Sequence, residues 1–373
     1  MKHSLLYIFI LAIMTGLLSC SKELEQDGGL VSDMPLVFSP TADWPQMGSG
    51  DLSGSGTRSG NGTGNGTGTG AVTKALVESA EDLKQYGISL FATATKGGDI
   101  YPVFNNDNLK FTGGSWNYDI TKYWIPGANY SFAAFAPYAG NTGDGVKLSN
   151  GTVSVSATAT EPSITITGYN SGRITGSGGF DARCEDLLFA AYTRDNTNEA
   201  DYSAVPLQFY HLMSCITFYI RNASKEDILS VDNIRLTGLK YKGTVNVGLS
   251  TFGVQPTGDE VEESENYFAG ENMSGTAQSP FLPKGMAEAQ SKYLFDCENI
   301  TVIPQILSGK NIKIKFMVNY SSRSKEYTGD LSSIDDITSW DMGKKYRYNI
   351  TISSDEIIFQ VQEIPWIEHE IEL

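Results

Sequence analysis

Short segments in which apolar and polar residues alternate recur from residue 87 to residue 361, and this pattern restricts the possible fold more than any other feature. Alternation puts every second side chain on one face of a β-strand, so we expect each segment to be a strand. The expected strands are 87–92, 130–136, 153–157, 164–167, 216–220, 244–247, 312–318, 346–352 and 357–361. Helical spacing is scarce, with its best example at residues 78–86. The pattern predicts an all-β fold built from β-sandwiches.

The length of the chain predicts more than one domain. A chain of 373 residues is too long for one compact core and suits about two domains. The polar stretch 193–203 is the expected boundary between them. We therefore expect an N-terminal β-sandwich over residues 75–200 and a C-terminal β-sandwich over residues 201–373.

Residues 1–19 have the pattern of an export signal. A basic start at Lys2 precedes an apolar run, residues 5–18, which is shorter than the roughly 20 residues that span a bilayer. The run ends in Leu-Leu-Ser followed by Cys20, which is typical of a bacterial lipoprotein signal. We expect cleavage before Cys20 and acylation of this residue, which would tether the mature chain to a membrane. The alternative is an ordinary secretory peptide in which Cys20 is incidental.

Residues 20–74 are expected to be a tether and linker that contains one small apolar cluster. The cluster is Leu36, Val37 and Phe38. Residues 48–70 follow, and 10 of these 23 residues are Gly, a composition typical of a flexible coil with a reach of about 25–30 Å. Two basic residues, Arg58 and Lys74, lie in or beside the Gly-rich stretch and should be accessible to a protease.

Composition and motifs exclude several classes of function. With 43 acidic and 27 basic residues the net charge is −16, which argues against nucleic acid as a partner. The nucleophile-elbow, phosphate-loop, dinucleotide-binding and zinc-protease motifs are all missing from the sequence. We therefore expect neither an enzyme nor a cofactor or metal site. Cys184, Cys215 and Cys297 lack zinc-site spacing and are expected to be buried thiols, or to include one disulfide.

A few polar and aromatic residues allow two interpretations. Residues 195–201 are similar to a calcium loop but lack its Gly and terminal Glu, so a solvated loop is favoured. Solvated loops are also favoured for the acidic run 259–265 and for Asp335–Asp336. His211 has no neighbouring nucleophile, and a packed histidine is favoured over a catalytic one. Five tryptophans could stack on sugars, but roles in the sandwich cores are favoured; they are residues 44, 116, 124, 340 and 366.

Several segments, in order along the chain, together form a recognisable series. They are 122–127 (Lys-Tyr-Trp-Ile-Pro-Gly), 130–137 (Tyr-Ser-Phe-Ala-Ala-Phe-Ala-Pro), 186–190 (Asp-Leu-Leu-Phe-Ala), 205–216, 300–305, 340–348 and Trp366. This series resembles the fimbrillin family, the type V pilins of Gram-negative anaerobes such as Bacteroides. Cys215 stands where the family usually has Lys.

The resemblance implies two tandem transthyretin-like β-sandwiches and a role as a fimbrial subunit in adhesion at the cell surface. In this family a lipoprotein precursor reaches the outer membrane, and a trypsin-like protease then removes an N-terminal segment. A terminal strand from another subunit fills the groove that opens. Leu36–Val37–Phe38 is the candidate removable strand. Thr73-Lys74-Ala75 occupies the place of the family's Thr-Arg-Ala or Thr-Arg-Gly, so Lys74 and the upstream Arg58 are candidate cleavage sites.

The last residues of the sequence are a candidate donor strand. Ile367, His369, Ile371 and Leu373 alternate with glutamates, which gives one mostly apolar face and one acidic face. Such a strand suits addition to a sheet of another subunit, although it could equally be the last strand of its own sandwich.

Two functions fit these observations. The first is a fimbrial subunit that polymerises by strand donation, with other subunits, a trypsin-like protease and a host or bacterial surface ligand as partners. The alternative is a surface lipoprotein that binds glycans for a nutrient uptake system through exposed Trp and Tyr side chains.

Overall fold

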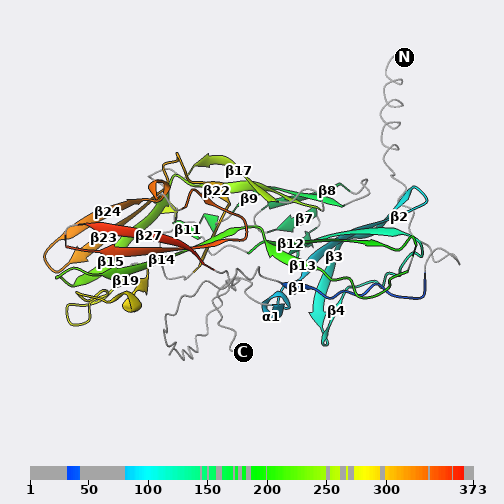
Figure 1. The fold of residues 1–373 in the computed structure, drawn as a ribbon, viewed down its shortest axis with the longest axis horizontal. Helices are drawn as coiled ribbons and strands as arrows, with labels where there is room; N and C mark the ends of the chain where they lie inside the picture. The colour runs from blue at the N-terminus through cyan, green and yellow to red at the C-terminus, as the bar shows by residue number, and fades with distance from the viewer. Residues whose placement is uncertain are drawn as a thin grey trace, which may run out of the picture.

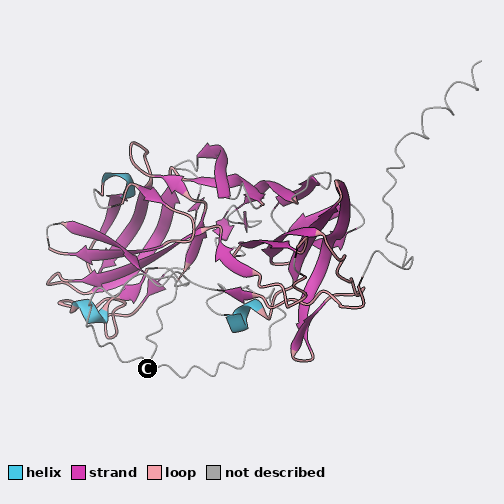
Figure 2. Ribbon diagram, turned by 45° about the vertical axis from the view of Figure 1, so that its right-hand side comes forward, coloured by secondary structure: helices cyan, strands magenta, loops and turns pink. Residues whose placement is uncertain are grey.

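The structure is a computed structural model, and its description covers most of the chain beyond residue 80. The described residues are 32–42, 80–142, 145–148, 151–156, 162–170, 173–174, 179–181, 186–198, 200–248, 253–260, 266–267, 273–294, 299–334, 337–354 and 356–364. Strands dominate these residues, and the helices are short (Figure 2). The helices are α1 (Ala80–Leu83) and the 3-10 turns η1 (Glu288–Gln290) and η2 (Leu331–Ser333). None of them is long and apolar enough to cross a membrane.

The expectation of an all-β chain is confirmed. Each strand expected from the alternation falls on an observed strand, for example residues 130–136 on β5 (Asn129–Ala136). The expected helix at 78–86 is shorter, because α1 covers only Ala80–Leu83 among the described residues. The longest strand, β3 (Asp99–Thr112), was missed. It carries two register shifts against β2, and Asn106 has a positive φ of 62°, so its apolar residues do not keep a period of two.

The first sheet holds the N-terminal half of the structure together (Figure 1). Its strand order is β1 (Thr41–Ala42), β13 (Gln208–His211), β12 (Leu188–Asp195), β5, β2 (Ile88–Lys96), β3 and β4 (Ser115–Asn117). The pairs are antiparallel except for β1 and β13, which run parallel. The outermost N-terminal strand thus joins the sheet through a partner that follows it by more than 160 residues.

The second sheet contains strands from both sides of the expected domain boundary. Its order is β17 (Gly253–Glu260), β16 (Lys240–Val247), β9 (Ser163–Asn170), β8 (Gly151–Ser156), β7 (Gly145–Leu148) and β6 (Gly140–Thr142). The pair β9–β16 spans the polar stretch 193–203. In Figure 1 this sheet extends along the top of the molecule between its two ends. Domains of residues 75–200 and 201–373 would therefore share this sheet, because each contributes strands to it.

The third and fourth sheets form the C-terminal end of the molecule. The third has the order β20 (Lys292–Tyr293), β14 (Ser214–Asn222), β26 (Lys345–Ile352) and β27 (Ile357–Ile364), with β21 (Ile300–Val302) also on β14. The fourth has the order β10 (Arg173–Ile174), β11 (Gly179–Asp181), β18 (Asn266–Tyr267), β15 (Ile228–Thr237), β23 (Lys313–Tyr320) and β24 (Ser324–Asp330), with β19 (Met273–Ser274) on β15. A separate short pair joins β22 (Gln305–Ile306) to β25 (Ser339–Trp340).

Three apolar clusters fill the structure. The segment core lies on one face of the first sheet and includes Leu36, Phe38, Trp124, Phe132 and Leu207. The middle core lies between the opposite face of that sheet and the second sheet, and it includes Phe91, Phe135, Phe189, Ile166 and Val245. The C-terminal core lies between the third and fourth sheets and includes Phe218, Tyr348, Phe316, Ile314 and Trp340.

A glycine allows the third and fourth sheets to close against each other at their edges. Gly329 on β24 lies directly under the ring of Phe359 on β27. A Cβ atom at residue 329 would lie 2.1 Å from Phe359 Cζ, far inside van der Waals contact. The aromatic ring thus occupies the space that a side chain would need, and it packs against the C-terminal core.

Gly329→Ala should therefore destabilise the C-terminal end of the molecule by about 1–3 kcal/mol, the usual cost of overpacking. Urea unfolding followed by tryptophan fluorescence would measure this loss. Thr328→Ala, at the exposed neighbouring position, should change the free energy of unfolding by about 0.5 kcal/mol or less. Adding Phe359→Leu should recover part of the loss in Gly329→Ala, and equal stability of the two alanine variants would contradict the argument.

Candidate functional site: the binding site of the N-terminal segment

The N-terminal segment, defined here as residues 32–42, lies in the structure as an extended strand between two other pieces of chain. On one side it pairs antiparallel with residues 122–124. Leu36 N donates to Lys122 O at 2.8 Å, and Trp124 N donates to Met34 O at 3.1 Å. Ser32 N donates to Trp124 O at 2.7 Å. This edge of the segment is therefore held by a regular ladder of backbone hydrogen bonds.

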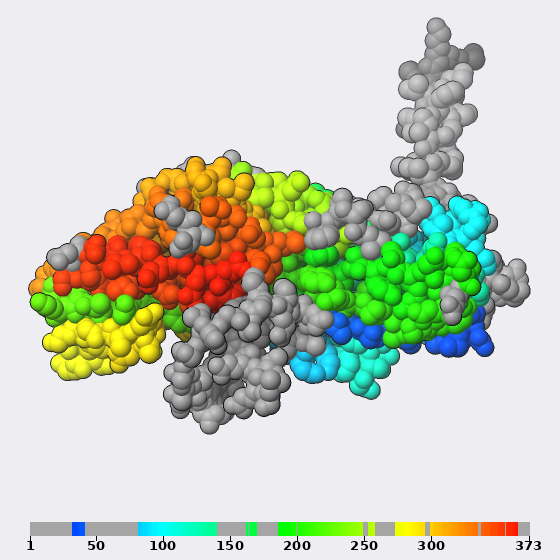
Figure 3. Space-filling model, viewed as in Figure 1, coloured from blue at the N-terminus to red at the C-terminus, as the bar shows by residue number. Residues whose placement is uncertain are grey.

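The other edge of the segment pairs parallel with residues 205–209. Val205 N donates to Val37 O at 2.8 Å, and Ser39 N donates to Val205 O at 2.9 Å. Thr41 N donates to Leu207 O at 2.8 Å, where β1 joins β13. The segment thus bridges two walls that are more than 80 residues apart in the sequence. Its outer face is visible at the surface of the N-terminal half as the blue band in Figure 3.

The side chains of the segment alternate between the core and solvent. Leu36 is 1% exposed and Phe38 is 7% exposed, whereas Val37 between them is 46% exposed. Pro40 continues the buried series. Full burial of a large apolar side chain is worth about 1.5–3 kcal/mol, so Leu36 and Phe38 contribute strongly to holding the segment in place.

Phe38 is surrounded by aromatic rings. Its ring makes edge contacts with Phe104 at 5.6 Å, Tyr118 at 5.9 Å and Phe132 at 6.0 Å between centroids. The Tyr118 hydroxyl also donates to Leu36 O at 2.7 Å. Burial raises the pKa of Tyr118 above its ordinary value, so this hydroxyl keeps its proton and remains a donor at neutral pH. The site therefore combines an aromatic pocket for one side chain with a fixed donor to the backbone.

Arg194 connects the two walls of the site. Its guanidinium donates to Ser203 O at 2.6 Å and to Ala204 O at 3.2 Å, immediately before Val205. The same group lies 5.1 Å from the centroid of the Trp124 ring, whose backbone forms the opposite wall. The Arg194 side chain is only 5% exposed. A buried planar cation thus contacts both walls and fixes their spacing.

The structure covers only some of the site residues expected from the sequence. Leu36, Val37 and Phe38 are the residues just described. Cys20, Arg58, Lys74, Ile367, His369, Ile371 and Leu373 lie outside the described residues, as do Cys184 and Cys297. Cys215 is buried, and its Sγ lies 3.7 Å from Asn299 Oδ1. The contributions of Tyr118 and Arg194 were missed, because neither side chain carries a local sequence signal for contact with a strand so far away.

The structure also shows the surroundings of the 195–201 loop and of His211, for which the sequence allowed two interpretations. In the 195–201 loop, Asp195 accepts hydrogen bonds from the Thr197 hydroxyl and backbone N–H, and these bonds lower the pKa of Asp195. Its carboxylate is thus used within the loop, as the solvated-loop interpretation expects. His211 is buried, with its Nδ1 2.8 Å from Asp186 Oδ1, so it is a packed histidine. Among the described residues no group of His, Cys, Asp or Glu side chains could hold a metal ion.

The described tryptophans are mainly core residues. Trp124 is fully buried and Trp340 is 1% exposed, so both are core residues rather than parts of an exposed stacking platform. Trp116 is half-buried against Phe111 in the β3–β4 hairpin, at 5.5 Å between ring centroids. The core interpretation is confirmed for Trp124 and Trp340.

Phe38→Ala should lower the free energy of unfolding of the N-terminal half by about 3–5 kcal/mol, because it empties the aromatic pocket. Val37→Ala is the matched control. It removes an exposed side chain from the adjacent position and should cost about 0.5 kcal/mol or less. Differential scanning calorimetry of the full chain would measure both, and similar melting temperatures for the two variants would show that the segment is not part of the folded core.

Arg194→Lys should loosen the segment without removing the charge, because an ammonium cannot reproduce the planar fork that reaches two carbonyls. We expect faster hydrogen exchange at the amides of Ser39 and Val205, measured by mass spectrometry. Arg323→Lys is the control, since the Arg323 guanidinium lies 4.2 Å from the Tyr320 ring centroid on an exposed part of the C-terminal half. Unchanged exchange at Ser39 and Val205 in Arg194→Lys would contradict the role given to Arg194.

Comparisons with known proteins give similar solved structures and a matching family model. A fimbrial protein from Bacteroides vulgatus is similar in structure, with a TM-score of 0.49 and 18% identity over 75% of this chain and 92% of that one. A fimbrial assembly protein from Parabacteroides distasonis gives a TM-score of 0.31 and 10% identity, over 79% of this chain and 93% of that one. No curated protein matches the sequence significantly. The family model described as fimbrillin-like matches residues 73–366, so the chain belongs to the fimbrillin-like family.

Proposed function

We propose that this protein is a fimbrial subunit that polymerises by strand donation and serves adhesion at the cell surface. It is exported as a lipoprotein acylated at Cys20 and reaches the outer membrane. A trypsin-like protease then cuts at Lys74 or Arg58 and frees the N-terminal segment. A strand from another fimbrial subunit, for which residues 367–373 are the candidate, takes its place. Two tandem transthyretin-like sandwiches are part of the same proposal.

The observation that carries this proposal is the way in which the N-terminal segment is bound. Among the described residues it is a single strand without a hairpin partner, yet it places Leu36 and Phe38 in the core and makes backbone hydrogen bonds along both edges. If the segment left, the two walls would expose unpaired N–H and C=O groups as well as apolar side chains. Such an opening strongly favours the addition of another strand.

The basic candidates for cleavage lie in the part of the chain that joins the segment to the first described helix. Residues 43–79 link Ala42 to Ala80, and Arg58 and Lys74 are both within them. A cut at either position separates the segment covalently and removes none of the contacts described for it. The proposal therefore needs cleavage followed by exchange, with the incoming strand regaining roughly 1.5–3 kcal/mol for each large apolar side chain that it buries.

Controlled proteolysis tests this proposal. The full chain is treated with dilute trypsin, the cut is located by mass spectrometry, and the product is incubated and analysed by size-exclusion chromatography. We expect oligomers after cleavage at Lys74 or Arg58, and a ladder on SDS gels of unheated samples, because strand-exchanged subunits dissociate slowly. The intact chain should remain monomeric.

The Lys74→Ala/Arg58→Ala double variant is the matched control for that experiment. It should resist the cut, keep its N-terminal segment and stay monomeric under the same treatment. Cleaved wild-type protein that stays monomeric at high concentration would contradict the proposal, and so would fibres formed on cells by the double variant.

A further inference from the structure

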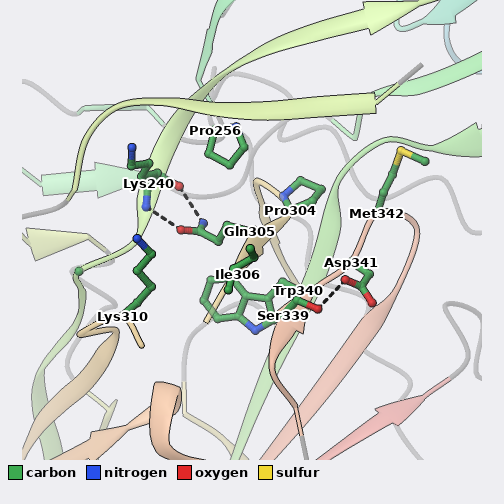
Figure 4. A pocket seen from close by; sticks show the side chains of 11 residues that line it. Lys240, Pro256, Pro304, Gln305, Ile306, Lys310, Ser339, Trp340, Asp341 and Met342 are labelled. Carbon is green, nitrogen blue, oxygen red and sulfur yellow. Dashed lines mark hydrogen bonds between the residues drawn. The ribbon is translucent and has the colours of Figure 1, made fainter. Parts of the chain in front are cut away.

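A pocket of about 430 Å³ lies at the short pair β22–β25 and shares no lining residue with the binding site of the N-terminal segment (Figure 4). Its central walls are apolar and come from Pro256, Pro304, Ile306, Trp340 and Met342. Ile306 is 65% exposed, which is unusual for a large aliphatic side chain at such a position. This pocket has no part in the strand exchange proposed above.

The charged groups of the pocket are separated along its length. Figure 4 shows Lys240 and Lys310 on one side of the apolar walls and Asp341 on the opposite side. The ion pairs between described side chains include neither lysine ammonium; Glu260, opposite Lys240 in the β16–β17 pair, has a side chain outside that description. The Asp341 carboxylate accepts a hydrogen bond from the Ser339 hydroxyl at 2.6 Å. One end of the pocket therefore suits carboxylates, and its middle suits apolar side chains.

The other polar groups in the pocket are already used. The Gln305 side chain accepts from Lys240 N at 2.9 Å and donates to Lys240 O at 2.9 Å. Trp340 Nε1 donates to the Tyr348 hydroxyl at 2.8 Å. Apolar walls with two lysines at one end match a peptide that carries both apolar and acidic residues.

The sequence contains such a peptide, and the fold brings the chain to the pocket just before it. Strand β27 ends at Ile364, which is paired with Lys345, and Lys344 Nζ lies 2.6 Å from Glu363 Oε1. Two residues before Lys344, Met342 lines the pocket next to Asp341. Residues 366–373 (Trp-Ile-Glu-His-Glu-Ile-Glu-Leu) follow a few residues after Ile364. Their acidic side chains complement the two lysines in charge.

The peptide of residues 366–373 is also long enough to extend from the end of β27 along the pocket. An extended chain advances about 3.3 Å per residue, so Glu368 and Glu370 can reach points roughly 13–20 Å from Ile364. Ile367 comes first on the apolar face and would meet the apolar walls near Met342. The glutamates come later and would reach the lysine side.

We propose that residues 366–373 bind in this pocket, with their apolar side chains against Ile306 and Met342 and their glutamates beside Lys240 and Lys310. The segment is then retained on the C-terminal half of its own chain. Binding there competes with any other use of the same residues. This inference does not depend on the proposed strand exchange, since the pocket and the binding site of the N-terminal segment share no residues.

Photo-crosslinking in the full chain tests the proposal. The photoreactive amino acid p-benzoylphenylalanine replaces Ile306, the protein is irradiated, and peptides joined to residue 306 are identified by mass spectrometry. We expect residues 366–373 as the captured partner. The same amino acid at Ile358 is the control, because Ile358 is another exposed isoleucine and lies at the opposite end of β27. Capture of a different segment from residue 306, or of none, would overturn the proposal.

Charge reversal separates specific binding from proximity. Lys240→Glu/Lys310→Glu should reduce the crosslink at least tenfold, and adding Glu368→Lys/Glu370→Lys should restore it. A yield unaffected by the lysine substitutions would refute the proposed recognition. Mixing 15N-labelled and unlabelled protein before irradiation should give crosslinks within one chain, and crosslinks between labelled and unlabelled copies would contradict binding within the same chain. The proteolysis assay described above tests the fimbrial mechanism independently. A negative crosslinking result would therefore contradict only the pocket proposal.

Discussion

The central strands of the first sheet, with both faces buried, are the constraint on which the rest of the structure depends. On β5, Phe132 and Ala134 point into the segment core, while Ala133 and Phe135 point into the middle core. Both neighbours, β2 and β12, divide their side chains in the same way. A strand with two buried faces cannot shift its register by one residue without moving large side chains into small spaces. The two cores are thus locked to one another through a single layer of backbone.

This arrangement explains how a segment near the start of the sequence can be held firmly and still be separate from the rest of the fold. The N-terminal segment contributes Leu36 and Phe38 to the segment core. It does not contribute a central strand to the first sheet. The aromatic pocket that receives Phe38 is built from Phe104, Tyr118 and Phe132, which are placed by elements of the first sheet and the loop that follows β4. The first sheet and the middle core provide the support for this site.

Local patterns predicted nine of the strands, missed others such as β3, β12 and β15, and did not predict how distant strands pair. The run 130–136 is apolar at nearly every position, and the structure explains this by burial of both faces of β5. The strand β3 was missed because its bulges around Asn106 break the alternation. Leu36–Val37–Phe38 stood out as an apolar cluster, yet its parallel pairing with Val205 depends on contacts across more than 160 residues. No local spacing in the sequence identifies such a partner. The contacts of Arg194 with both walls could not be predicted for the same reason.

The covalent link between the N-terminal segment and the rest of the chain has a physical role of its own. While residues 43–79 are intact, a segment that leaves its site stays covalently attached, so its rebinding is an intramolecular event. A cut within the link leaves every described contact of the segment in place but makes rebinding bimolecular. The fraction of sites occupied by the segment then depends on the segment's concentration. A competing strand that is held close to the site would bind at a higher effective concentration than the released segment. Under the proposed function, cleavage would therefore change which strand occupies the site without weakening a hydrogen bond in it.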